Sequence, residues 1–383
     1  MGIDEFVLDF VKKTRYFTND IDLSEAEQTR LKGMFDDVLS SVIKEPNNEE
    51  MPLALIICST YNKYSVVMPA RLKKGGLKYY ILYDRHLTEI NRLLDAIYLD
   101  DNESAHDIWK LSYELFAEEA LLREDEVLTS YYGLNKVALG PFEVDITEQD
   151  NLDFIVEIQE RYIMGHELGH WIFSMSEKKM AENNFNITFD ADWDKFLDNL
   201  HTLLSELYDE YRKKFASKEY TDILNEQQAV VNENSKIQEE CFADAIAYAM
   251  VFSDMELNYP DDLEQKLLAG KALLLQMMNL QLLAMQNMTV SEESFEIAVS
   301  IRLGFLRNYS MLYFEGAEEV FDRMLAKTAV RYEERITNIM LECFSELEMR
   351  GDNIYDALVD SDGTMDMGKV LGIAELSKAY KIT

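Results

Sequence analysis

Cysteine, proline and glycine are all scarce in this chain of 383 residues, and each shortage excludes a class of protein. The cysteines, Cys58, Cys241 and Cys343, are odd in number and form no C-x-x-C pair, so neither a disulfide framework nor a cysteine-built zinc finger is expected. The 5 prolines and 15 glycines are too few for a sandwich or barrel with a turn about every 10 residues. We therefore predict a mostly helical protein of a reducing compartment, the cytoplasm.

Positive charge and long hydrophobic runs are also lacking. Lysine and arginine total 37 against 72 aspartates and glutamates, a net charge of −35, which would repel nucleic-acid backbones and anionic lipid surfaces. The most apolar stretch, 272–288, is interrupted by glutamines and asparagines and falls short of the ~20 apolar residues that span a bilayer. We therefore expect no nucleic-acid partner and no membrane association, and we interpret this stretch as a buried helix.

The pattern of the remaining residues predicts an α+β fold that is predominantly helical. Apolar residues recur at helical spacing over most of the chain, whereas the β signal is confined to the first third. Segments rich in Ile, Val and Tyr predict a three-stranded meander, in a small antiparallel or mixed sheet, at 53–61, 64–72 and 77–84. A fourth strand is predicted at 134–144, where a Gly-Pro pair indicates an edge strand. Such an edge is able to receive an extended peptide.

Domain boundaries are indicated only by changes of element type, because no linker rich in Pro, Ser or Gly is visible. We expect an N-terminal region with the sheet at 1–145, a catalytic core at 146–255 and a helical region at 256–383. Helices are expected at about 4–17, 24–44, 86–98, 104–122, 148–176, 193–216, 220–253, 261–288, 291–312, 315–349 and 368–379.

One motif points directly to chemistry. Residues 166–170 read His-Glu-Leu-Gly-His, inside a segment with helical periodicity and no proline. Positions i and i+4 of a helix lie one above the other, so His166 and His170 project from one face and are able to bind one Zn²⁺. Glu167 then lies where a water must lose its proton. The chain has only 5 histidines, which argues against a chance pairing.

A catalytic zinc site needs a third protein ligand. In the metzincin pattern a Gly and a His would follow the motif, but Phe173 and Ser176 occupy those positions. The other solution takes a Glu from a second helix, with an Asp four residues later, and residues 240–244 read Glu-Cys-Phe-Ala-Asp. Glu239 is an alternative ligand, although helical periodicity favours Glu240 because it shares one face with small and acidic residues.

Together the two motifs resemble those of the gluzincin metallopeptidases, the family of thermolysin-like enzymes. The finer pattern Glu-x-x-Ala-Asp-x-x-Ala at 240–247 is similar to that of CAAX-processing and minimal soluble gluzincin peptidases. The resemblance covers about 162–170 and 239–247. Glu240 follows His170 by 70 positions, a longer gap than in thermolysin-like enzymes, which leaves room for a helical insertion.

This resemblance implies a zinc-dependent metallopeptidase, a hydrolase that cleaves the peptide bonds of a protein or peptide substrate. The residues that it implies are zinc ligands His166, His170 and Glu240, general base Glu167, and Asp244 as acceptor of the free ring N–H of His166.

Peptide hydrolysis also needs a group that stabilises the developing oxyanion. The candidates on the helix at about 291–312 and just beyond it are Arg302, Arg307, Tyr309 and Tyr313, and we favour Arg302.

Two interpretations from other classes stay open. A zinc-stabilised helical scaffold or ligand sensor would keep the metal ligands without turnover, but it has no use for Glu167. An acidic interaction module without metal would need both motifs to be coincidental. Cys241 is excluded as a nucleophile because it has no independent histidine partner.

Overall fold

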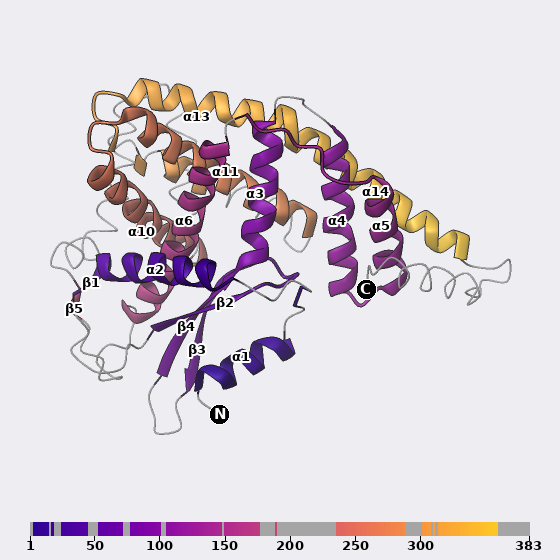
Figure 1. Cartoon of the computed structure of the whole chain (residues 1–383), viewed down its shortest axis with the longest axis horizontal. Helices are drawn as coiled ribbons and strands as arrows, with labels where there is room; N and C mark the ends of the chain where they lie inside the picture. Colours follow the sequence, from indigo (N-terminus) through magenta and orange to yellow (C-terminus); the bar gives the residue numbers. More distant parts are fainter. Residues whose placement is uncertain are drawn as a thin grey trace. The chain divides into compact units, whose positions relative to one another are not determined.

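The structure is a computed structural model and is predominantly helical with a small mixed sheet, as predicted (Figure 1). It describes residues 3–14, 17–18, 24–44, 53–71, 77–100, 105–147, 149–176, 188–189, 235–287, 301–307, 309–310 and 313–358. The helices expected at 193–216 and 368–379 lie outside these residues.

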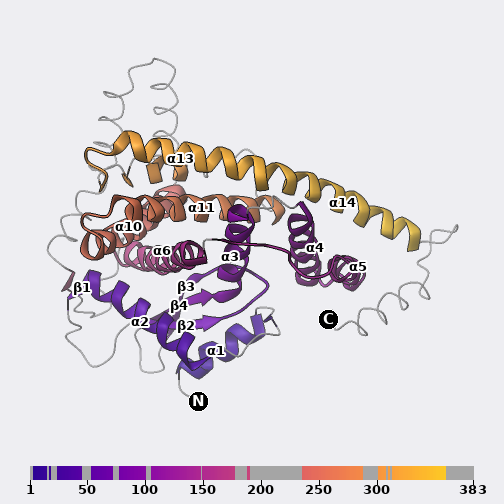
Figure 2. The same ribbon diagram turned by 45° about the horizontal axis from the view of Figure 1, so that its top comes forward.

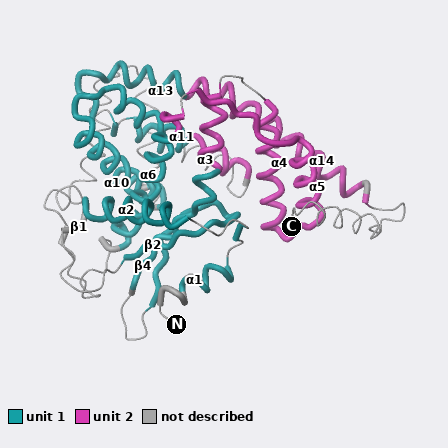
Figure 3. The backbone as a smooth tube through the Cα atoms, viewed as in Figure 1, with its two compact units in different colours: residues 1–89, 153–277, 290–328 teal, residues 90–152, 278–289, 329–383 magenta. Residues whose placement is uncertain are grey.

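The chain divides into two compact units, coloured separately in Figure 3. The first consists of residues 1–89, 153–277 and 290–328, and the second of residues 90–152, 278–289 and 329–383. These units differ from the three ranges expected from the sequence. Several boundaries between the two units fall inside continuous helices. A change of element type along the sequence therefore does not mark these boundaries.

The three-stranded sheet belongs to the first unit. Its strand order is β2 (Leu53–Cys58), β4 (Leu77–Asp84), β3 (Val66–Arg71). Because β2 runs parallel to β4 and only β3 pairs with it antiparallel, the predicted meander is wrong. β4 is central because its side chains are the most deeply buried, Tyr80 and Ile81 fully so. β3 lies at an edge, where Pro69 is tolerated although it has no N–H to donate.

Helices cover both faces of this sheet. α1 (Ile3–Thr14) packs Val7 and Val11 against a core that includes Tyr80 of β4. Side chains alternate between the faces of a strand, so Tyr79 points the other way and meets Trp171 of α6 (Gln149–Ser176), with 6.4 Å between ring centroids. The sheet therefore lies against the helix that carries the His-Glu-x-x-His motif.

A partly buried ion pair attaches α2 (Glu25–Val42) to the same helix. The guanidinium of Arg30 lies 2.5 and 2.9 Å from the two carboxylate oxygens of Glu160, which is buried in α6. The bidentate geometry satisfies the buried charge. A second, two-stranded sheet pairs β1 (Ile43–Lys44) antiparallel with β5 (Thr188–Phe189).

The remaining first-unit helices are α10 (Ser235–Asn258), the first part of α11 (Leu263–Asn287), the helical residues 301–307 and the first part of α13 (Glu318–Tyr332). Among the described helices, α11 alone is long and apolar enough to cross a membrane, with a mean hydropathy of 1.4, and 61% of that window is buried. Burial of this extent is typical of the core helix of a soluble protein, in agreement with the interpretation of 272–288 as a buried helix.

The second unit contains α4 (Ala105–Leu122), α5 (Glu126–Ala138), a π-helical turn (Glu333–Thr337), α14 (Asn338–Leu358) and most of α3 (Arg85–Leu99). The strand predicted at 134–144 is wrong, because α5 occupies the first part of this range. The carboxylate of Asp125 accepts the N–H of Leu128 and starts the helix, and Tyr132 is then buried and bonds to Leu347 O at 2.9 Å. The cap and this tertiary contact hold the preceding turns helical, and the helix continues through Ala138 into the range predicted as a strand.

α6 and α10 lie side by side in both Figure 1 and Figure 2, and small residues let their backbones approach closely. A Cβ at Gly169 would lie only 2.6 Å from Ala243 Cα, and one at Gly165 would lie 3.0 Å from Ala247 Cα. Gly165 and Gly169 are four residues apart, as are Ala243 and Ala247, so each pair lies along one face of its own helix. The two motifs found in the sequence are therefore brought together by glycine on one helix and alanine on the other.

We predict that Gly169→Ala destabilises the protein by about 1–3 kcal/mol, because the new methyl group meets backbone that cannot rotate away. Displacing α10 should also weaken metal binding. Gly33→Ala is the matched control: it lies in α2, and nothing lies within 4 Å of the place that its methyl group would take, so the exchange should stabilise the helix by up to ~1 kcal/mol. Chemical denaturation of both variants is the measurement, and equal stability would show that the close approach is not required.

Candidate metal centre

The two histidines of the motif converge as the helix spacing predicts. α6 is buried on most sides, so its register is fixed by the core, and His166 and His170 lie one turn apart. Their Nε2 atoms are 3.1 Å apart, and the rings meet edge to face with 4.7 Å between centroids. Both rings therefore present a nitrogen to the same small volume.

Glu240 of α10 completes the group. Its Oε2 lies 3.5 Å from Nε2 of His166, and its Oε1 lies 3.5 Å from Nε2 of His170. Tetrahedral Zn²⁺ with bonds of about 2.0–2.1 Å separates its ligands by roughly 3.3 Å. The observed spacings of 3.1, 3.5 and 3.5 Å are close to this value, and the last two are made by different oxygens of Glu240. Among the described residues, these three form the group able to hold a metal ion.

The other ring nitrogens both face carboxylates. Nδ1 of His166 is 3.0 Å from Asp244 Oδ1, and Nδ1 of His170 is 2.9 Å from Glu239 Oε1. A carboxylate at Nδ1 holds the hydrogen there, which leaves the Nε2 lone pair free for a metal. Glu239, the alternative ligand in the sequence, thus lies against the second histidine and not within the donor group.

Electrostatics keep the acids of this group ionised. Burial lowers the pKa of His166, but hydrogen bonds to Asp244 and Glu240 outweigh it and raise the pKa to about 9. Burial raises the pKa of Glu240, but contacts with His166 and Arg302 dominate and lower it to about 2. The pKa of the fully buried Asp244 is also held below its usual range, chiefly by the charge of Arg302 against the cost of burial. Both carboxylates are therefore anionic and favour a cation.

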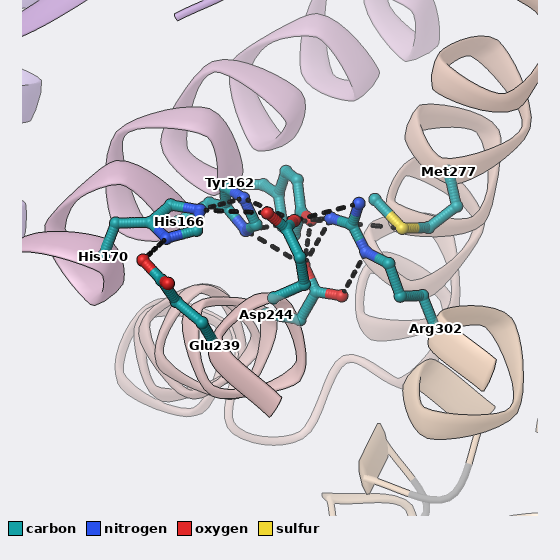
Figure 4. A network of polar contacts seen from close by, with 8 residues as sticks. Tyr162, His166, His170, Glu239, Asp244, Met277 and Arg302 are labelled. Atoms are coloured by element: carbon teal, nitrogen blue, oxygen red, sulfur yellow. Dashed lines mark hydrogen bonds and ion pairs between the residues drawn. The ribbon is translucent and has the colours of Figure 1, made fainter. Parts of the chain in front are cut away.

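Arg302 lies on the far side of Asp244 from His166 and His170, as Figure 4 shows. Its Nε and Nη2 each lie 2.8 Å from an oxygen of Asp244, and its Nη1 is 3.2 Å from Glu240 Oε2. A pocket lies next to the donor group and is lined in part by His166, His170 and Glu240. Arg302 is not among the described residues that line it. Its predicted role at the oxyanion stays a prediction, and its contacts are with the carboxylates of the centre.

Glu167 lies in that pocket, which encloses about 580 Å³. Its side chain is buried, and the backbone of Val67 in β3 hydrogen-bonds to it. Burial raises the pKa of Glu167, while the neighbouring His166 and His170 oppose the rise. The pocket is lined by Ser65, Val66, Val67, Pro69, Tyr79, His166, Glu167, His170, Ser174, Glu239 and Glu240. The acid next to the donor group thus opens onto a cleft bordered by the edge strand.

The other oxyanion candidates lie elsewhere. Arg307 forms a bidentate pair with Asp322, both contacts being 2.6 Å. Tyr309 and Tyr313 pack within an aromatic cluster, with their rings tilted and 5.9 Å between centroids. The thiol of Cys241 is buried, which raises its pKa to about 12 and keeps it protonated.

Two contributors were missed in the sequence, and one of them left a signal there. Tyr162 lies one turn before His166 on the same helix, and its hydroxyl donates to Asp244 Oδ1 at 2.5 Å. Continuing the i, i+4 spacing backwards from the motif would have found it. The border formed by β3 left no such signal, because strand order depends on tertiary pairing.

Comparison of the chain with family models, curated proteins and solved structures finds no match. The resemblance to gluzincin peptidases therefore rests on the motifs and on the geometry of the centre.

We predict that Asp244→Ala weakens zinc binding by ~10–100-fold, because His166 loses the acceptor that orients its ring. Glu239→Ala should cost less, near the lower end of that range, because this carboxylate is 37% exposed and that of Asp244 is 0% exposed. Competition with a chromophoric chelator gives the affinities. Glu264→Ala, an exposed acid at the start of α11, is the control for charge alone. Wild-type affinity in Asp244→Ala would remove this residue from the centre.

Proposed function

We propose that the chain is a zinc-dependent metallopeptidase, with His166, His170 and Glu240 as the residues that hold the ion. The observation that supports this most is the position of Glu167, a buried carboxylate that adjoins the donor group and opens onto the pocket. Zn²⁺, when bound, supplies Lewis acidity, which polarises a carbonyl and acidifies a water. The alternative, a structural zinc site, is normally closed by four protein ligands, whereas three donors converge among the described residues.

In this proposal Glu167 is the general base. Its carboxylate takes a proton from the attacking water and returns it to the amine that leaves when the C–N bond breaks. Burial raises the pKa of Glu167, and a general base is most efficient when its pKa lies near the working pH. His166 and His170 keep their rings fixed through Asp244 and Glu239, so the donor atoms need not reorganise.

The substrate we propose is an extended peptide. It binds along β3, because the segment 134–144, which was predicted as the receiving edge strand, is helical in its first part. β3 is an edge strand that borders the pocket, and edges of this kind bind peptides by adding a strand. The backbone contact from Val67 to Glu167 places this edge beside the proposed base. Bound antiparallel, a peptide would pass its carbonyl groups in front of the donor group.

The proposed location is the cytoplasm, and the proposed partners exclude nucleic acid and membranes. The three cysteines are free and buried, as expected for a reducing compartment. The charge of −35 disfavours polyanionic partners.

We predict about one Zn²⁺ per chain in the purified protein and far less in His170→Ala, because two donors hold the ion much more weakly than three. Elemental analysis measures this. His106→Ala should keep its zinc, since this histidine bonds to Leu139 O in the other unit. Negligible metal in the wild type would end the metallopeptidase proposal.

We predict that Glu167→Gln keeps zinc but lowers kcat by ~10²–10⁴-fold, because the amide has a similar shape and cannot accept a proton. Cleavage of a library of blocked peptides, followed by mass spectrometry, gives the rate, and the inactive variant also serves to trap substrates. Glu157→Gln, an exposed exchange on the same helix, should cleave at the wild-type rate. The scaffold alternative predicts no cleavage by any of the three proteins, and an active Glu167→Gln would exclude this residue as the base.

A further inference from the structure

Arg302 makes more contacts with Asp244 and Glu240 than an ordinary ion pair requires. Two nitrogens of its guanidinium donate to the two oxygens of Asp244, at 2.8 Å each, and the third nitrogen lies 3.2 Å from Glu240 Oε2. A guanidinium presents its donors in a rigid planar fork, so these three distances fix the two carboxylates relative to one another. Lysine, a point charge on a flexible stem, does not have this geometry.

The grip on Asp244 reaches the first histidine. Oδ1 of Asp244 is shared by Arg302, by the hydroxyl of Tyr162 at 2.5 Å and by Nδ1 of His166 at 3.0 Å. Arg302 also donates to the Tyr162 hydroxyl at 3.2 Å. Because the Asp244 side chain is 0% exposed, these donors and no bulk water determine where its oxygens lie. The orientation of the His166 ring therefore depends on Arg302 through Asp244.

The contact with Glu240 is separate and acts on the ligand itself. Arg302 lies 3.2 Å from Oε2, which is also 3.5 Å from Nε2 of His166, whereas Oε1 lies 3.5 Å from Nε2 of His170 and has no such contact with Arg302. A carboxylate with one oxygen held by a guanidinium tends to bind a metal through the other oxygen alone. Such one-point binding keeps a coordination position open, as catalysis requires and a structural site does not.

We propose that Arg302 is a positioning residue of the metal centre, which holds His166 through Asp244 and restricts Glu240 to one-oxygen binding. This inference rests on the metal centre of the proposed function and assigns to Arg302 a different role from oxyanion stabilisation. It also makes the centre dependent on the helical residues 301–307, which lie outside both sequence motifs.

The experiment compares Arg302→Lys, Arg302→Met and Tyr162→Phe with the wild type, using Zn²⁺ affinity and the visible spectrum of the Co²⁺-loaded protein. Arg302→Met should bind Zn²⁺ ~10–100-fold more weakly, and its Co²⁺ bands should lose intensity, because two-oxygen binding by Glu240 raises the coordination number above four. Arg302→Lys keeps the buried charge paired and guards against misfolding. It should still weaken Zn²⁺ binding by about 10-fold, because the fork is lost. Tyr162→Phe should have the smallest effect.

The matched control is Arg307→Met on the same helical segment. Arg307 also forms a bidentate pair, with Asp322, so its loss reproduces the cost of a broken pair without touching the centre. It should leave affinity and spectrum unchanged. Wild-type affinity and spectrum in Arg302→Lys, or an equal loss in Arg307→Met, would overturn the inference. A wild-type protein that binds no metal would instead overturn the proposed function.

Discussion

The close contact between α6 and α10 is the constraint on which the rest of the centre depends. Without a Cβ at Gly165 and Gly169, the helices approach until backbone meets Ala243 and Ala247. At this separation a glutamate on one helix reaches two histidines on the other. Larger residues at these positions would hold the helices apart by the width of a methyl group, and the donor spacing of 3.1–3.5 Å would be lost.

Buried charge is the second requirement, and it is satisfied locally. Asp244 is fully buried, a situation that costs several kcal/mol for an unpaired ion, and Arg302, Tyr162 and His166 supply its hydrogen bonds. Such a network stabilises little relative to an apolar core, but it is intolerant of a missing partner. Such a rigid network would suit the proposed metal centre, because it fixes the orientation of each proposed ligand in advance.

The pocket brings together the proposed base and the edge strand proposed to bind peptide, which come from different layers of the fold. Glu167 belongs to the buried helix α6, whereas Val67 belongs to strand β3, which lies earlier in the chain. Their backbone-to-carboxylate contact joins the sheet to the centre. This arrangement supports peptide hydrolysis more than a purely structural zinc site, in which a base and an open edge would serve no purpose.

The sequence by itself determined what depends on local spacing: helix content, the shared face of His166 and His170, and the pairing of Glu240 with Asp244 four residues later. It did not determine the strand order, the helical state of 134–138 or the position of Arg302, because each depends on contacts between residues far apart in the chain. β4 became central through burial on both faces, and Tyr132 was drawn into a helix by a partner more than two hundred residues away. The choice between Glu239 and Glu240 also depended on tertiary packing. Neighbouring residues on a helix point in different directions. The close approach of α10 to α6 therefore places Glu240 in the donor group and leaves Glu239 against Nδ1 of His170.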